Sequence, residues 1–476
     1  KVDVLALGTE TDAELADLAE KTGGKLYFAS AKTESADFIA AMSDSVSNHV
    51  DSKDQPVTVM SRDLNFTNPS EEQIETVKLD SDLGRQTVFT LTHDKTDSIE
   101  MIIIPPIKKT TYKGIANTKV NMIEYVVEGN AEPGDWKVNI TTVGSNVLST
   151  RKTRLRRSLI VTSKQKRVKG SAPPLDVVTA HASLDTLTVA EMTADTRIKA
   201  FVRVGRGEVP VLGASVKMVI SRPIGTSQEV NMLDNGSGSD ITANDGIYSG
   251  YVTPRQLNAA GEYNIVAIVD GISGQVKVPI KQTRTGAPPT SWDRADAGSV
   301  RDTKSIDGFR RDTVAGKFRL LQFNADVNRV DRVAPDEISD MRVEVTSDKE
   351  VTLHWTAVGD DGDQGTAYIY HIGASTDGAQ LRTNFNATSQ CCNATAPDAI
   401  GLQLIKGALK PQTAGSKESV TLKVTKNVPG ANSQLYFSVV TQDKAGNQGV
   451  PSLPVSVSFL EPKFADTSSN NGNLSN

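Results

Sequence analysis

From about Val57 onward, the chain repeats short segments in which apolar and polar residues alternate, separated by turn-forming residues. This alternation puts every second side chain on one face of a strand, so each segment predicts a strand with one buried face. A first group comprises TVFTLT, IEMIII, MIEYVV, DWKVNITTV and SLIVTS, and a second comprises IKAFVRV, SVKMVIS, GIYSGYV and EYNIVAIVD. Many short strands separated by Gly, Asn, Asp and Pro predict β-sandwiches.

The first 50 residues follow a different pattern. VDVLALG at residues 2–8 is a nearly continuous apolar run, typical of a parallel strand covered on both faces. Thr11 and Glu14 then form a capping-box pattern, and two glycines at residues 23–24 end the expected helix. KLYFAS predicts a second strand and ADFIAAMSDSVSNHV a second helix. Residues 1–50 are therefore expected to be the end of an α/β sheet whose earlier strands are absent.

A third strand-rich group contains VTLHWTA, AYIYHI, LYFSVVTQD and VSVSF. The 476 residues are too many for one core, and about 150 residues per domain gives about three units. The sequence thus predicts a multidomain, mainly β protein, with a β-sandwich at 55–165, a second at 166–283, a polar, Arg-rich linker at 284–334, a third at 335–462 and a disordered tail at 463–476.

Composition argues against several classes of function. The net charge of −5 and the isoelectric point of about 5.7 do not favour a nucleic-acid partner. No run approaches the ~18 apolar residues of a membrane-spanning helix. The five histidines show neither an H-E-x-x-H motif nor zinc-finger spacing with the cysteines, so zinc and cysteine catalysis are not expected. The adjacent Cys391 and Cys392 are free, bonded to each other or paired with a missing segment.

Residues 233–250, LDNGSGSDITANDGIYSG, are called the aspartate loop here. The three carboxylates of this loop, with the side chain of Asn244 or Asn235 and backbone carbonyls, fit the oxygen-ligand shell of Ca²⁺. The alternative is a solvated turn, because Gly, Asn and Asp all favour turns. The loop is not an EF-hand, since strands flank it and the closing Glu is missing. The expected calcium ligands are Asp234, Asp240, Asn244 and Asp245.

GDDGDQG at residues 359–365 is a second acidic cluster. It is interpreted as an exposed loop between strands, with a weak cation site as the alternative.

TRKTRLRRS at residues 150–158 contains an R-x-R-R arrangement that ends at Arg157. This arrangement fits cleavage after Arg157 by a furin-type protease. The alternatives are a solvated basic loop inserted in a hairpin and a site for an acidic glycan or sulfated partner.

Six N-x-Ser/Thr sequons favour a secreted, glycosylated protein. They lie at Asn65, Asn139, Asn235, Asn386, Asn393 and Asn473. A glycan on Asn235 would compete with its use as a metal ligand. The chain begins at Lys1 without Met or an apolar leader, which predicts a fragment or a processed product. Trp136, Trp292 and Trp355 are expected to be packing residues.

The third group also carries a family pattern. HWTAVGDDGDQGTAYIY, followed further along by LYFSVVTQDKAGNQG, resembles a fibronectin type III domain with Trp355 as its core tryptophan. Together with the α/β start, the two β-sandwiches, the aspartate loop, FRRDTVAGKF and APDEISDMRV, the order of parts resembles the C-terminal portion of the calcium-activated chloride channel regulators. The resemblance implies that residues 1–50 end a von Willebrand factor A domain.

Members of that family carry an N-terminal zinc metalloprotease domain that cleaves the protein itself, and their secreted fragments modulate anoctamin-type chloride channels. The resemblance therefore implies a secreted, non-enzymatic regulator, associated with the cell surface, that acts through protein contacts. The family's H-E-x-x-H and D-x-S-x-S motifs are absent here, so neither metal centre is carried over to a residue of this chain. The alternatives are the non-catalytic part of a secreted, self-cleaving protease and an adhesion protein of the A-domain and fibronectin type.

Overall fold

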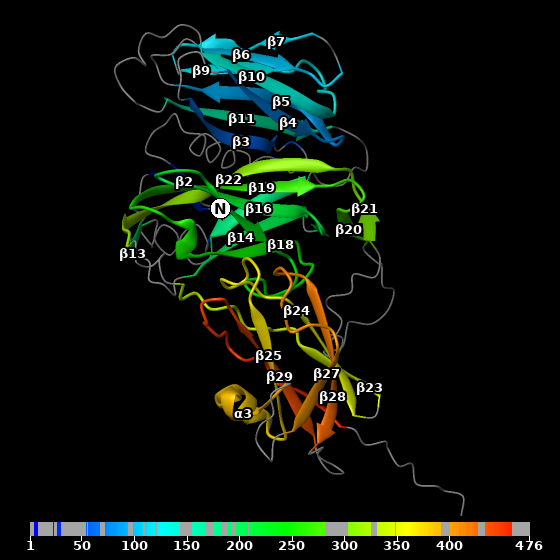
Figure 1. Ribbon diagram of the computed structural model, residues 1–476. Coiled ribbons are helices and arrows are strands. Elements are labelled where there is room, and N and C mark those ends of the chain that lie inside the picture. The colour runs from blue at the N-terminus through cyan, green and yellow to red at the C-terminus, as the bar shows by residue number, and fades with distance from the viewer. Residues whose placement is uncertain are drawn as a thin grey trace, which may run out of the picture. The chain divides into compact units, whose positions relative to one another are not determined.

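In the computed structural model (Figure 1), nearly all regular secondary structure among the described residues is β-strand, and the chain divides into two compact units, Lys1–Val333 and Ala334–Asn476. The structure describes residues 4–7, 22, 26–29, 54, 56–66, 72–93, 99–107, 110–119, 121–142, 155–166, 175–181, 188–191, 197–207, 209–280, 303–324, 331–347, 349–391, 400–426 and 434–458. The expected multidomain, mainly β fold class is confirmed.

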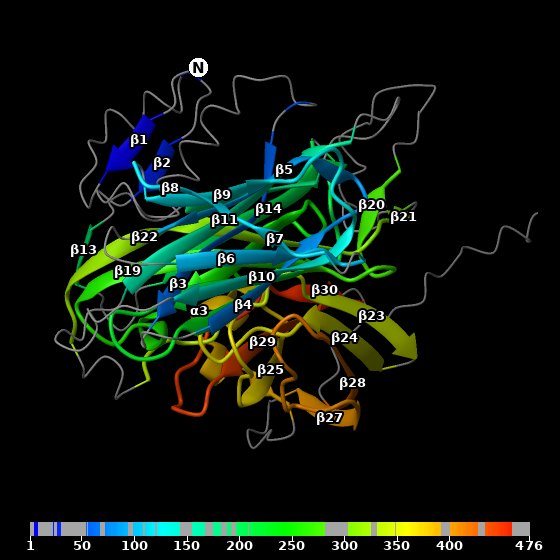
Figure 2. The same cartoon turned by 90° about the horizontal axis from the view of Figure 1, so that it is seen from above.

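Two short strands open the first unit. β1 (Val4–Leu7) and β2 (Leu26–Ala29) pair in parallel, with Val4 opposite Leu26, and Figure 2 shows them side by side. These are the two parallel strands expected from the apolar runs. The expected helices and the tail at 463–476 lie outside the described residues.

The first β-sandwich has two sheets around one core, and all of the expected strands are present. The smaller sheet has the order β4 (Glu72–Leu79), β10 (Gly134–Thr142), β6 (Ile99–Ile104), β7 (Tyr112–Lys113). The larger sheet contributes β3 (Pro56–Phe66), β11 (Leu155–Gln165), β5 (Leu83–Thr92), β9 (Met122–Val126) and β8 (Ile115–Asn117). The Trp136 ring packs against Phe89 in this core, with ring centroids 5.7 Å apart, as expected for a packing residue.

The second β-sandwich has a core of its own, in which the rings of Tyr263 and Phe318 stack at 4.9 Å. One sheet contributes β17 (Gln228–Met232), β16 (Ser215–Ser221), β19 (Gly261–Gly271) and β22 (Phe309–Gln322), and β13 (Thr188–Glu191) pairs with β22. The other comprises β12 (Leu175–His181), β14 (Ile198–Arg206), β15 (Val209–Pro210) and β18 (Ile247–Val252). Two minor elements, a 3-10 turn at Pro254–Gln256 and the pair β20 (Lys277–Pro279) and β21 (Thr303–Ser305), complete it.

The predicted linker at 284–334 is wrong for residues 303–322. β22 pairs with β19 along eleven residues, and Phe309, Phe318 and Leu320 belong to the core of the second sandwich. β22 also pairs with β3 at Asp312 and Met60, so one ten-stranded sheet runs through both sandwiches instead of ending near residue 166. The sequence of β22 looks irregular because Arg311 and Asp312 are buried in it against ionic partners far away in the chain.

The second unit is a sandwich of two four-stranded sheets. One has the order β23 (Arg342–Ser347), β24 (Glu350–Thr356), β28 (Lys417–Lys426), β27 (Gly401–Lys406). The other has the order β26 (Ser389–Gln390), β25 (Ile369–Ser375), β29 (Leu435–Gln442), β30 (Val455–Val457). In chain order these are the A-B-E-D and C-F-G arrangements of immunoglobulin-like sandwiches, with β26 as an additional C′ strand beside C, which agrees with the expected fibronectin type III-like domain.

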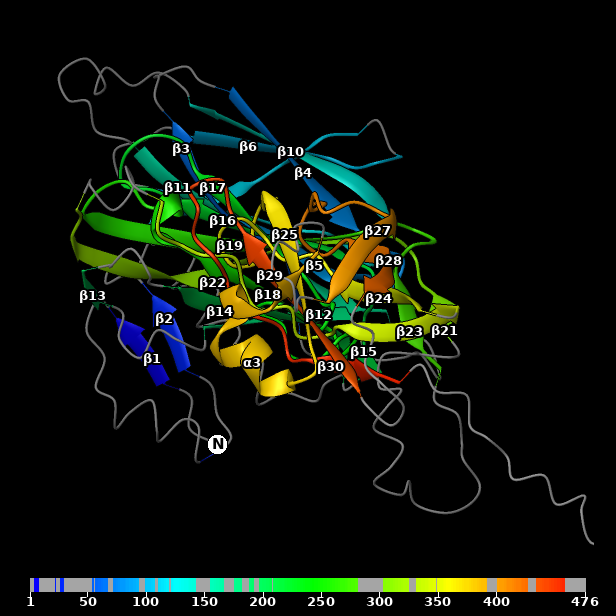
Figure 3. The ribbon, with the colours of Figure 1, turned by 60° about the horizontal axis from the view of Figure 1, so that its bottom comes forward.

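Trp355 occupies the centre of this unit, where its ring meets the Tyr370 ring edge to face at 5.0 Å. Figure 3 shows the short helix α3 (Gly378–Thr383) beside β29, and a 3-10 turn at Phe385–Ala387 follows it. Cys391 is disulfide-bonded, so the free-thiol alternative is wrong for this residue. No helix among the described residues is long and apolar enough to cross a membrane.

Candidate functional site

The aspartate loop connects β17 in one sheet of the second sandwich to β18 in the other. Its ends are joined by two backbone hydrogen bonds of 2.8 Å between Leu233 and Ser249. The Tyr248 hydroxyl then anchors the exit of the loop, because it donates to the carbonyl of Val211 at 3.0 Å. At Gly246, φ is +79° and a Cβ would lie 2.9 Å from the carbonyl oxygen of Val204, so the tight return requires glycine.

Three carboxylates of the loop come together. Asp234, Asp240 and Asp245 each offer an oxygen, and these oxygens all lie within 4.8 Å of one another. Two ligand oxygens on opposite sides of a single Ca²⁺ are about 4.8 Å apart, because each Ca²⁺–O distance is about 2.4 Å. The carboxylates therefore fit the coordination sphere of one ion. Asn244, the fourth expected ligand, lies in the same loop with a φ of 62°.

The same carboxylates also organise the loop by hydrogen bonding. One oxygen of Asp240 accepts from the backbone N–H groups of Asn235 and Gly236, both at 2.6 Å. Asp234 accepts from the N–H groups of Asp245 at 3.2 Å and Gly246 at 3.1 Å. These hydrogen bonds agree with the interpretation of the loop as a turn, and the closely spaced carboxylate oxygens agree with its interpretation as a cation site. The geometry therefore fits both interpretations of the sequence.

The electrostatics of the loop disfavour three bare charges. Burial raises the pKa of Asp234 to about 6; the N–H of Gly246 opposes this increase, and the nearby charges of Asp240 and Asp245 add to it. Burial also raises the pKa of Asp240, although the N–H groups of Gly236, Asn235 and Thr242 oppose that increase. A proton or a cation relieves the cost of keeping these groups ionised together.

The metal-free loop is expected to become more stable as the pH falls from 7 to 5. Because the pKa of Asp234 is higher in the folded state, that state holds more protons than the unfolded state between about pH 4 and pH 6, and stability is lost as the pH rises through this range. Amide hydrogen exchange of residues 234–247 in a chelator, corrected for intrinsic rates, measures this effect. With calcium the trend should vanish or reverse, because protons compete with the ion. A decrease in amide protection on acidification, measured in the chelator, would contradict this prediction.

The second acidic cluster, at 359–365, is not an exposed loop throughout, because Asp361 and Asp363 are buried. The N–H of Gly359 donates to the carbonyl of Gly362 at 2.8 Å, which folds the segment into a tight turn. Asp363 accepts from the side-chain amide of Gln364 at 2.6 Å. Within the described part of the chain, these carboxylates do not gather as a group of three metal ligands.

Cleavage after Arg157 does not fit the folded chain. Arg157 lies in β11, opposite Leu64 of β3, and is only 1% exposed. A protease needs an accessible, extended segment, whereas this backbone belongs to a sheet. The alternative of a solvated basic loop is wrong at Arg157 for the same reason. Arg154 lies outside the described residues.

The sequons lie in different surroundings. Asn386 is exposed in its 3-10 turn, while Asn139 is half-buried on β10 and donates to Glu72. Asn235 accepts from the N–H of Ser237 at 3.0 Å, so its side chain takes part in the turn. Asn65 is in β3, with a side chain that is not described, and Asn393, Asn473 and Trp292 lie outside the described residues.

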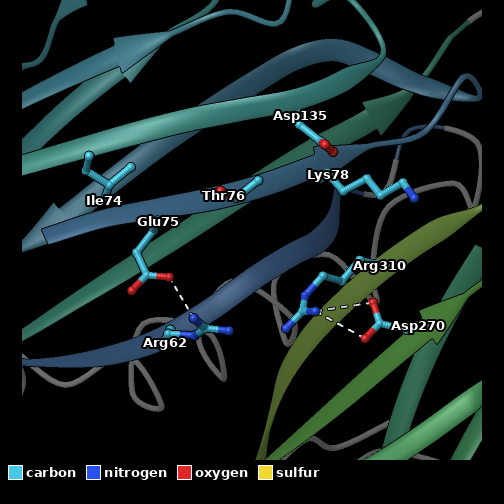
Figure 4. A pocket seen from close by; sticks show the side chains of 8 residues that line it. All are labelled: Arg62, Ile74, Glu75, Thr76, Lys78, Asp135, Asp270 and Arg310. Atoms are coloured by element: carbon cyan, nitrogen blue, oxygen red, sulfur yellow. Dashed lines mark hydrogen bonds and ion pairs between the residues drawn. The ribbon is translucent and has the colours of Figure 1, made fainter.

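A charged cavity of about 430 Å³, which no sequence pattern predicted, lies between the two sandwiches of the first unit and is shown in Figure 4. Its charged lining residues are Arg62, Glu75, Lys78, Asp135, Asp270 and Arg310. These residues come from β3, β4, β10, β19 and β22. Because they are far apart in the sequence, no local pattern indicates the site.

Comparison with known proteins identifies relatives along nearly the whole chain. Calcium-activated chloride channel regulator 1 of Sus scrofa is 27% identical over 484 residues, which cover 97% of this chain and 48% of the relative. The human protein of the same name is 26% identical over 97% of this chain and 48% of its own length. The chain is a relative of the calcium-activated chloride channel regulators. It spans about half the length of the regulators that it matches.

Two further kinds of similarity accompany this relationship to the regulators. A family model described as the second Ig-like domain of conditioned medium factor matches residues 185–285, which include the aspartate loop. Among solved structures, a DUF4785 family protein from Legionella pneumophila aligns over 83% of this chain and 92% of its own, at 13% identity and a TM-score of 0.26. The FN1–FN3 domains of chicken CNTN1 align over 82% of this chain and 99% of theirs, at 11% identity and a TM-score of 0.17. At these TM-scores the two structures establish no common fold with the chain.

Proposed function

We propose that this chain is a secreted, non-catalytic regulatory part of a channel-regulating protein. In this proposal its β-sandwiches bind an anoctamin-type chloride channel, or another cell-surface protein, and thereby modulate calcium-activated chloride conductance. The observation that carries the proposal is the similarity to channel regulators over 93–97% of the chain. The six sequons support an extracellular location, and the exposed side chain of Asn386 is accessible to a glycan.

A binding role is also favoured by the chemistry of the aspartate loop. In the part of the chain that the structure describes, the clustered ligand groups are three carboxylates. Carboxylates are the ligands of Ca²⁺, whereas hydrolytic zinc sites depend on histidine or cysteine. We propose that Ca²⁺ bound by Asp234, Asp240 and Asp245, with Asn244, would hold the loop in one conformation.

The contact residue that we propose within this loop is Ile241. It follows Asp240 directly and is 84% exposed. An apolar side chain held outward on a rigid loop suits a pocket on a protein partner, because preorganisation reduces the entropy lost on binding.

The proposal is tested by adding the purified chain to cells that express an anoctamin-type channel and recording whole-cell chloride current in extracellular calcium. We expect the chain to increase the current, and both Ile241→Ser and Asp240→Asn to remove most of the increase. Ile405→Ser is the matched control, because Ile405 is also exposed but lies in the second unit, on β27. An inactive wild-type chain would refute the regulatory role. Full activity of the Ile241 variant would refute this contact alone, and calcium-dependent cell binding without a change in current would favour the adhesion alternative.

A further inference from the structure

We infer that a set of ion pairs, with members on both faces of β22, holds the two sandwiches of the first unit together as one body. We call this set the ionic joint. The ionic joint is defined by Arg62, Asp80, Asp82, Arg206, Arg310, Arg311 and Asp312. It does not depend on the proposed function, because it concerns only how the two sandwiches are held together.

On one face of β22, Asp312 is the shared acceptor. It is fully buried and accepts from Arg62 of β3 and from the Nε of Arg310 at 3.0 Å. Arg62 also pairs with Glu75 at 2.6 Å, and Arg310 with Asp270 at 3.1 Å; Figure 4 shows both pairs facing the charged cavity. A carboxylate of the second sandwich is thus held by a cation of the first.

On the other face, the turn between β4 and β5 reaches the second sandwich with three consecutive residues. Asp80 pairs with Arg311, which is fully buried and, as the neighbour of Asp312 in a strand, points to the opposite face. Ser81 donates to Asp307 at 2.8 Å, and Asp82 pairs with Arg206 of β14 at 2.5 Å. Burial opposes ionisation of Asp80, yet its pKa is lowered because Arg311 outweighs that cost.

Backbone pairing contributes little at this boundary. The ladder between β22 and β3 consists of one residue pair, Asp312 with Met60, compared with eleven between β22 and β19. The charged cavity lies beside this single residue pair, so close apolar packing does not fill the space between the two sandwiches there. Because a buried charge that loses its partner is strongly destabilising, the ionic pairs decide whether the sandwiches stay docked.

The test measures the distance between the sandwiches in the full chain. Spin labels are attached to unnatural azide-bearing residues at Ile115 and Ile272, which are 75% and 53% exposed and lie in the first and second sandwich. The wild-type chain should give one narrow distance distribution by pulsed electron paramagnetic resonance. Asp312→Asn should broaden or split it, and should lower the melting temperature of the first unit by about 10 °C.

Two further variants make the result decisive. Glu229→Gln removes the exposed Lys217–Glu229 pair within the second sandwich and should leave the distribution narrow. If Asp312→Asn fails to fold, Arg206→Gln, which removes the partly buried pair with Asp82 and the favourable charge of Arg206 near Asp80, should broaden the distribution to a smaller degree. If Asp312→Asn folds and its distance distribution is as narrow as that of the wild type, the inference is overturned. If Asp312→Asn does not fold, an equally narrow distribution in Arg206→Gln would overturn it.

Discussion

Replacing Asp240 with asparagine is expected to abolish the stabilisation of the first unit by calcium. In the proposed site, calcium at about one hundred times its dissociation constant stabilises the folded state by about 2.7 kcal/mol, or about 5–10 °C in melting temperature. Asparagine keeps an oxygen that can accept from the N–H groups of Asn235 and Gly236, so the loop should still fold. The substitution removes one of the three carboxylates within reach of the ion.

The measurement is calorimetric melting of the full chain with calcium and with a chelator, combined with isothermal titration of the metal. Asp377→Asn is the matched control, because Asp377 caps α3 in the second unit and asparagine is an equally good cap. This control should keep the full calcium response. A wild-type chain that shows no shift in millimolar calcium would mean that the carboxylates form a solvated turn and bind no calcium at that concentration.

Replacing Trp355 with alanine is expected to destabilise the second unit by about 3–5 kcal/mol. The indole is 2% exposed, and its edge-to-face contact with Tyr370 adds to the loss on truncation. Such a cost is a large share of the stability of one domain, so a substantial unfolded population is expected at 37 °C.

Hydrogen exchange of the β24 and β29 amides in the full chain reports on this unit separately from the first. Val345→Ala on the edge strand β23 is the control, because Val345 is 47% exposed and its truncation should change stability by less than about 0.5 kcal/mol. A loss below about 1.5 kcal/mol for Trp355→Ala would show that Trp355 is not the centre of this core.

These experiments separate local from long-range determinants. The calcium and tryptophan predictions concern features visible in short stretches of sequence, an acidic glycine-rich loop and a period-two strand that carries Trp355. The ionic joint differs in kind, because Arg62 and Asp312 are 250 residues apart in the chain, and Arg311 and Asp80 are 231 apart.

The positions of many strands were determined by the sequence itself. Alternation of apolar and polar side chains is a local property, and it located β5, β6, β14, β16 and β24 because each buries one face and leaves the other only partly buried. The aspartate loop was likewise evident, since turn residues and carboxylates lie next to one another in the chain.

Only the tertiary structure decided the identity of β22, the continuity of the ten-stranded sheet and the burial of Arg157 and Asp361. From the sequence alone, charged residues are predicted to be exposed to solvent, because burying an unpaired charge is costly. In β22 the chain offsets that cost with partners from another sandwich, so Arg311 and Asp312 are buried in a segment that resembles a linker. The burial of a charged residue depends on ionic partners that folding brings close to it. A short stretch of sequence does not indicate which distant residues these partners are.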